Sequence, residues 1–264
     1  MRVALSMALA MAVLVAAAPW CLRAERESLE GLDRRWRWAL FALLLGVLVA
    51  RLLIPHGPLR CDDGEFLARA AMGWEQAAMS RAPGFPLLLA FFGGFTEISL
   101  DLAYLLNGVA AMAFPILAFV LGWRCFGSGA AAFGGALLAT VHPLVFVHGQ
   151  SSEYHVWANT FFLAVLALAM GYPQRPNRAS LVAAAAAGAL CVCFGVELVA
   201  LVAPLLGWML YVTWRERRGD WDVVAAVALS FALLATPAVQ GLIAGGTKDG
   251  SLETAVDFAA QNPD

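Results

Sequence analysis

Three carboxylates lie within four positions of one another about a quarter of the way along the chain. Asp62, Asp63 and Glu65 belong to the stretch from Arg60 to Leu89, which reads RCDDGEFLARAAMGWEQAAMSRAPGFPLLL. Carboxylates this close repel one another, and such groups serve as general bases or cation ligands. The stretch is therefore the strongest indication of function in the sequence.

The composition of the rest of the chain places these acids beside a membrane. Of the 264 residues, 61% are hydrophobic and 14% charged, and the mean hydropathy is +0.75. Several apolar runs approach or exceed the roughly 18 to 20 residues that cross a bilayer as a helix. They are continuous and rich in Ala and Leu, without the alternation of a membrane β-barrel. We expect an all-α, polytopic membrane protein with about eight transmembrane helices.

Charge and cysteine content exclude other classes. The net charge is −2, and no basic cluster is interleaved with aromatic residues, so we expect no nucleic-acid partner. The cysteines lack the spacing of metal ligands, and most fall in or beside expected spans, so neither a disulfide framework nor a zinc site is predicted. They are Cys21, Cys61, Cys125, Cys191 and Cys193.

Apolar runs and helix breakers define the expected elements. The expected transmembrane helices cover residues 1–20, 38–54, 102–123, 129–147, 156–172, 181–194, 198–214 and 223–243. Phe66, Ala70 and Trp74 recur every four residues, which predicts an amphipathic interfacial helix at 63–79. A second interfacial or partly inserted piece is expected at 87–95. We favour a retained first helix over a cleaved signal peptide, because the arginines follow its apolar run.

Three segments follow from this scheme. Residues 1–35 form an N-terminal membrane helix with a basic cytoplasmic linker, residues 36–245 a transmembrane module whose first outer loop is 55–101, and residues 246–264 a polar outer tail. The distribution of basic residues gives the orientation. Eleven are expected inside (Arg23, Arg26, Arg34, Arg35, Arg37, Arg124, Arg175, Arg178, Arg215, Arg217, Arg218) and six outside (Arg2, Arg51, Arg60, Arg69, Arg81, Lys248). The acidic stretch then faces outward from a plasma membrane or a bacterial inner membrane.

The order of these features resembles the glycosyltransferase-C superfamily of membrane sugar transferases. Within it, the chain is most similar to the protein O-mannosyltransferase-related family, whose motifs are D-x-G-E-F and H-P-P-G-x-P-L. The corresponding segments here are DDGEF at 62–66 and RAPGFPL at 81–87. Weaker similarities are SEY at 152–154, at the head of an expected helix, and GVELVALVAP at 195–204. The chain departs from the family in two histidines, because Arg81 and Glu197 stand at or near their places.

The resemblance implies transfer of a sugar, with mannose as one candidate, from a polyprenyl-phosphate donor to a hydroxyl on a protein or glycan acceptor, with inversion. Asp62 matches the position of the base, and Glu65 belongs to the same motif. Residues expected to bind donor phosphate or substrate are Asp63, Arg81, Glu153, Tyr154, His155 and Glu197. Three neighbouring acids also suit Mg²⁺ or Mn²⁺, but no spacing fixes a metal site.

Each assignment has a structural alternative. Asp62 also suits a helix cap, and Glu65 a solvated helix face. Arg81 also suits pairing with lipid headgroups, and Tyr154 a membrane-interface belt. Glu197 lies within an apolar run, where an ionisable group is costly unless it is paired or hydrated.

Two other functions compete with glycosyl transfer. One is a transporter or lipid flippase, although such proteins place charges near the bilayer midplane within repeated halves, and no repeat is visible here. The other is a truncated or catalytically inactive accessory protein, favoured by the short C-terminal part and the two absent histidines. An additional subunit that completes the site is a further possible partner, besides the bilayer.

Overall fold

The computed structural model describes residues 2–53, 61–73, 77, 83–142, 155–174, 177–195 and 198–216. Within these ranges every regular element is a helix, which confirms the expected all-α class. The helices are α1 (Arg2–Ser28), α2 (Arg34–Leu53), α3 (Cys61–Ala71), α5 (Gly84–Gly93), α6 (Leu100–Phe126), α7 (Gly129–Val141), α9 (His155–Gly171), α10 (Arg178–Phe194) and α11 (Val199–Glu216).

Short polar residues begin three of the helices. The side chain of Ser99 accepts a hydrogen bond from the backbone N–H of Leu102, and Asn177 accepts one from Ser180 in the same way. Ser128 caps α7 similarly. These bonds satisfy N–H groups that the first turn of a helix leaves without a partner. Gly127 ends α6 in the left-handed conformation (φ 60°), which costs glycine little.

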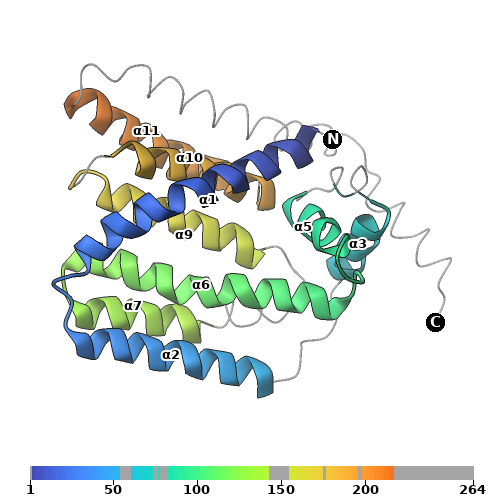
Figure 1. The fold of residues 1–264 in the computed structure, drawn as a ribbon, viewed down its shortest axis with the longest axis horizontal. Helices are drawn as coiled ribbons and strands as arrows, with labels where there is room; N and C mark the ends of the chain where they lie inside the picture. Colours follow the sequence, from blue (N-terminus) through green and yellow to red (C-terminus); the bar gives the residue numbers. More distant parts are fainter. Residues whose placement is uncertain are drawn as a thin grey trace.

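The alanine-rich helix α10 lies at the centre of the larger core. Nearly every residue from Ser180 to Phe194 is buried, and α1, α9 and α11 all pack against this helix. Met7 and Ala10 of α1 belong to the same cluster of buried side chains. Figure 1 shows α1 running across α10, with α9 beside them. Small side chains allow the backbones to approach closely, as is typical of membrane helices.

A second layer consists of α6, α7 and α2. Gly122 allows α6 and α7 to meet, since a Cβ atom on this glycine would lie 2.9 Å from the Cα of Ala132. The ring of Trp36 on α2 lies 5.9 Å from that of Phe133 on α7. No described residue of α2 is buried, so one side of this layer presents an apolar surface.

Two helices, α2 and α6, are long and apolar enough to cross a membrane by length and composition. α7, α9, α10 and most of α11 are shorter apolar helices. They begin or end within a few residues of the expected spans, while the span expected at 223–243 and the tail at 246–264 lie outside the described residues.

The first outer loop differs from the expectation. The helix predicted at 63–79 begins at Cys61 and ends at Ala71, and Gly73 follows with a φ of 98° that breaks the helical path. The piece predicted at the interface, 87–95, overlaps α5, which begins at Gly84 and ends at Gly93. Every residue from Gly84 to Leu89 is buried within the protein, which hydropathy cannot distinguish from burial in lipid. Further along the same piece, Phe91 and Phe95 are exposed.

A buried polar contact joins α9 to α11. The hydroxyl groups of Tyr172 and Thr213 lie 2.6 Å apart, and Thr213 also donates to the carbonyl of Met209 at 2.9 Å. Because a threonine hydroxyl has one proton, Tyr172 is the donor in their shared bond.

Replacing Tyr172 by Phe is expected to lower the free energy of unfolding by about 0.6 kcal/mol, the average for hydrogen bonds between membrane helices, and by no more than about 1.7 kcal/mol. Unfolding of the detergent-solubilised protein would measure the change. Tyr211→Phe is the control, because Tyr211 is exposed on the same helix as Thr213. Equal stability of the two variants would show that the Tyr172 hydroxyl contributes nothing.

Candidate functional site

The acidic helix α3 is held in place by its apolar face. Phe66 and Ala70, one turn apart, are buried, and α3 packs against α5. The ring of Phe66 meets that of Phe85 edge to face, with centroids 6.3 Å apart. Asp62, Asp63 and Glu65 occupy the first turns of this helix, while their side chains lie outside the described residues.

A second contact joins α5 to the end of α10. A Cβ atom on Gly84 would lie 2.7 Å from two ring carbons of Phe194 and 3.0 Å from the carbonyl oxygen of Cys193. Real Cβ atoms do not approach so closely, so only glycine fits at this position without displacement. The PGFP segment is thus seated directly on the last turn of α10.

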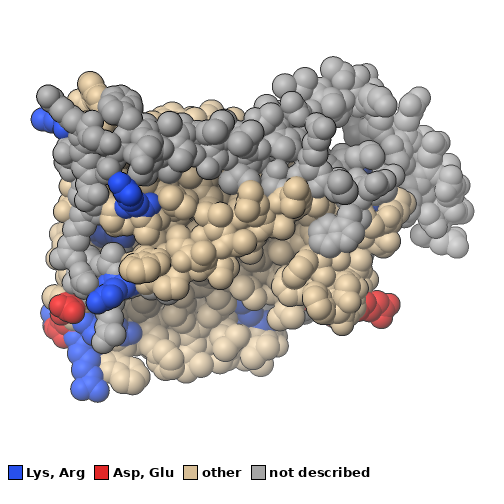
Figure 2. Space-filling model, turned by 45° about the horizontal axis from the view of Figure 1, so that its top comes forward, with Lys and Arg blue, Asp and Glu red and all other residues tan. Residues whose placement is uncertain are grey.

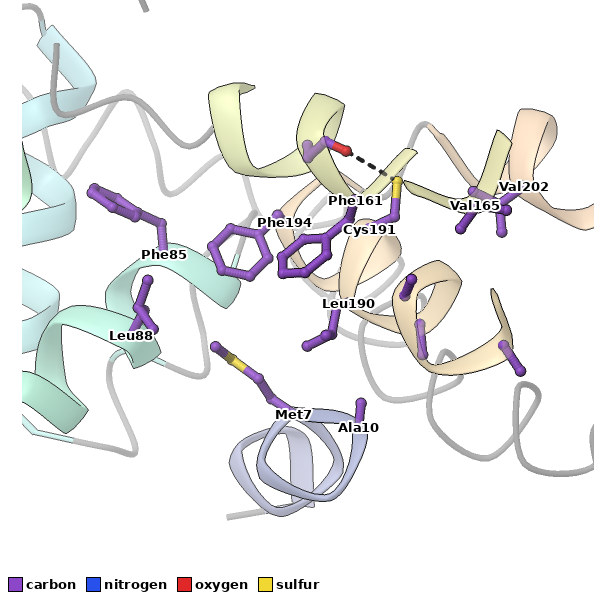
Figure 3. Close-up of a cluster of buried hydrophobic side chains, with 14 of the residues drawn as sticks. Met7, Ala10, Phe85, Leu88, Phe161, Val165, Leu190, Cys191, Phe194 and Val202 are labelled. Carbon is purple, nitrogen blue, oxygen red and sulfur yellow. Dashed lines mark hydrogen bonds between the residues drawn. The ribbon is translucent and has the colours of Figure 1, made fainter. Parts of the chain in front are cut away.

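The same phenylalanine joins α10 to the beginning of α9. Its ring stacks on Trp157, with centroids 5.6 Å apart and planes at 22°, and lies 5.5 Å from that of Phe161. The Cys191 thiol donates to the Ala158 carbonyl at 3.3 Å. Figure 3 shows Phe85, Phe194 and Phe161 side by side, with this hydrogen bond next to them. We call Phe66, Phe85, Phe194, Trp157 and Phe161 the aromatic seam.

The aromatic seam brings together four segments from three separate parts of the sequence. They are the first turns of α3, the beginning of α5, the beginning of α9 and the end of α10. Figure 1 shows the beginning of α9 and the end of α10 at the same end of the molecule as α3 and α5. Each of these segments adjoins one of the motifs singled out in the sequence.

Of the remaining predicted site residues, His155 is described, and it is the half-buried first residue of α9. The others, Arg81, Glu153, Tyr154 and Glu197, lie outside the described residues. In the sequence, Arg81 precedes Gly84 by three residues, Tyr154 directly precedes His155, and Glu197 is the second residue after Gly195. Their assignments therefore stay predictions.

Two polar groups near the seam were not singled out from the sequence. The indole N–H of Trp157 is shielded from solvent and has no acceptor among the described residues. Such a donor costs about 1–3 kcal/mol if nothing accepts from it. Asn107 is fully buried on α6. The sequence could have indicated Asn107, because its amide side chain interrupts an apolar span. Nothing in the sequence distinguishes Trp157 from the other tryptophans.

The metal prediction is untested. Within the described part of the chain, no group of three His, Cys, Asp or Glu side chains is placed to hold a metal ion. The side chains of Asp62, Asp63 and Glu65 lie outside that part.

Comparison with known proteins identifies no relative: no protein-family model, curated protein or solved structure matches the chain.

Proposed function

We propose that the chain is a multi-pass membrane glycosyltransferase that moves a sugar from a polyprenyl-phosphate donor to a hydroxyl acceptor. The observation that carries the proposal is the convergence at the aromatic seam. Segments that adjoin the DDGEF, RAPGFPL, SEY and GVEL motifs meet at one end of the helical bundle, although the first and the last of these motifs are more than a hundred residues apart in the sequence. A site assembled from such distant segments suits a reaction between two substrates.

The surface of the molecule supports membrane residence. On α2, Trp38, Phe41, Leu45, Leu48 and Leu52 are all exposed. Exposed apolar side chains over the whole length of a helix are costly in water and ordinary in lipid. We extend this to about eight spans, with the acidic helix on the outer face, because the apolar helices and the arginine distribution fit that scheme.

The reaction assigns a task to each predicted residue. The acceptor oxygen attacks the anomeric carbon as the bond from that carbon to the phosphate oxygen breaks, which inverts the configuration. Asp62 takes the acceptor proton, and Glu65 orients the acceptor beside it. The departing polyprenyl phosphate gains negative charge. The guanidinium of Arg81 is suited to stabilise this charge by hydrogen bonds to the phosphate oxygens.

The other predicted residues bind the substrates. In the sequence, Glu153, Tyr154 and His155 precede Trp157, and Glu197 follows Phe194; we assign these four residues to contacts with the acceptor or the sugar. Asp63 is assigned to substrate binding beside Asp62.

A donor assay tests this function directly. The purified chain, reconstituted in vesicles, would be given polyprenyl-phosphate sugars labelled in the sugar, with peptide and glycan acceptors. Label is expected to move from at least one lipid-linked donor, and none from the same sugars supplied as nucleotide diphosphate esters. Transfer from nucleotide sugars alone, or from none of the donors, would contradict the proposal.

A further inference from the structure

Arginine and tryptophan residues follow the same order on three separate helices. Trp20 precedes Arg23 by one turn on α1, Trp38 follows Arg34 by one turn on α2, and Trp214 adjoins Arg215 near the end of α11. In each case the arginine lies nearer the helix terminus and the tryptophan nearer the apolar middle. These three pairs, Trp20, Arg23, Arg34, Trp38, Trp214 and Arg215, are called the arginine–tryptophan belt.

All six side chains are accessible. The exposed fractions of Trp20, Trp38 and Trp214 are 65%, 57% and 47%, and the three arginines are also exposed. Figure 1 shows the end of α1, the beginning of α2 and the end of α11 at the same end of the molecule. Figure 2 shows most of the blue Lys and Arg atoms gathered at that end, at the left of the view.

The three arginines of the belt are exposed. Arg23, Arg34 and Arg215 make no ion pair or hydrogen bond with any residue that the structure describes. Nearby, Asp33 is paired with Arg35 at 2.9 Å, and Glu30 is exposed. The end of the molecule that carries the belt therefore presents exposed guanidinium groups, and the nearby carboxylate of Asp33 is already paired.

We propose that the arginine–tryptophan belt binds the headgroups of anionic phospholipids in one leaflet. The guanidinium groups lie at the depth of the lipid phosphates, and the indole rings lie nearer the apolar middle of each helix, at the level that interfacial tryptophans prefer. The exposed apolar residues of α2 continue this order toward the acyl chains. The inference rests on the membrane residence in the proposed function and is independent of sugar transfer.

Quenching of tryptophan fluorescence by brominated lipids tests the belt. The full chain would be reconstituted in phosphatidylcholine vesicles containing equal amounts of either brominated phosphatidylcholine or brominated phosphatidylglycerol. Stronger quenching is expected from the brominated anionic lipid. Each arginine attracts anionic headgroups by about 1 kcal/mol, which raises their local concentration beside the tryptophans by about fivefold. A variant with Trp20, Trp38 and Trp214 changed to Phe should lose most of this quenching, which would assign the signal to the belt.

Charge variants identify the binding groups. Changing Arg23, Arg34 and Arg215 together to Gln is expected to reduce the preference for the anionic lipid by roughly tenfold or more. The matched Arg→Lys triple variant should keep most of it, because the charge is retained. Equal quenching by the two lipids in the wild type, or an unchanged preference in the Gln variant, would overturn the proposal. Absence of quenching by either lipid would overturn membrane residence as well, whatever the donor assay shows.

Discussion

Asp62→Asn is expected to reduce the rate of sugar transfer by about 10²- to 10⁴-fold, the usual contribution of a general base. Asparagine keeps the shape of the side chain but cannot accept the acceptor's proton. Because Asp62 lies in the first turn of α3, the change also removes a favourable interaction with the helix dipole, which amounts to only about 0.3–1 kcal/mol. The assay is single-turnover transfer by reconstituted protein, at equal protein amounts.

Asp101→Asn is the matched control for this loss. Asp101 is an exposed acid in the first turn of α6, so the same chemical change occurs at a comparable helix position outside the proposed site. We expect it to leave transfer unchanged. Full activity of Asp62→Asn would exclude Asp62 as the base and direct the test to Glu65→Gln. Equal losses in the Asp62 and Asp101 variants would indicate a general effect of charge.

Gly84→Ala is expected to reduce transfer by about a hundredfold, the size of effect that follows a misplacement of about 1 Å near reacting groups. The added methyl group would lie 2.7 Å from the ring of Phe194, so α5 or the ring must move. Both belong to the seam that joins α3 to α9 and α10. Overpacking of this kind also costs about 1–3 kcal/mol of stability, measurable by thermal unfolding in detergent.

Gly108→Ala provides the control, because a Cβ atom on Gly108 of α6 meets nothing within 4 Å. Alanine stabilises a helix relative to glycine, so this variant should be at least as stable and as active as the wild type. Adding Phe194→Leu to Gly84→Ala makes room for the methyl group and should restore part of the activity. A Gly84→Ala variant with unchanged transfer would show that the close contact does not position the site.

The sequence predicted the acidic helix better than it predicted the segments that follow it, up to residue 95. DDGEF followed by Phe66 and Ala70 at helical spacing predicted a helix with an apolar face, and α3 has that face buried. The expected single helix to residue 79 is interrupted after Ala71, because Gly73 adopts a positive φ that no periodicity signals, and residues 74–76 and 78–79 lie outside the described residues. Of the expected interfacial piece at 87–95, Leu87 to Leu89 are covered by protein within α5, whereas Phe91 and Phe95 are exposed.

The residues of the aromatic seam show what sequence patterns leave undetermined. Phe194 and Trp157 are 37 positions apart, yet their rings stack. Nothing in either local sequence separates these aromatic residues from those that face outward, such as Phe41 or Phe126. Contacts of this kind depend on the shapes of two distant surfaces, which meet only when the helices have packed.

The sequence by itself determined the helical class, most helix limits and the segregation of arginine to one end, because hydropathy, capping residues and charge act locally or on the membrane as a whole. Tertiary structure alone decided that α10 is central, that α1 covers it, and that Gly84 meets Phe194. The physical reason is that lipid-facing and protein-facing positions are both apolar in such helices. The pattern that reveals the buried face of a helix in water is therefore weak here, and only side-chain packing selects which faces meet.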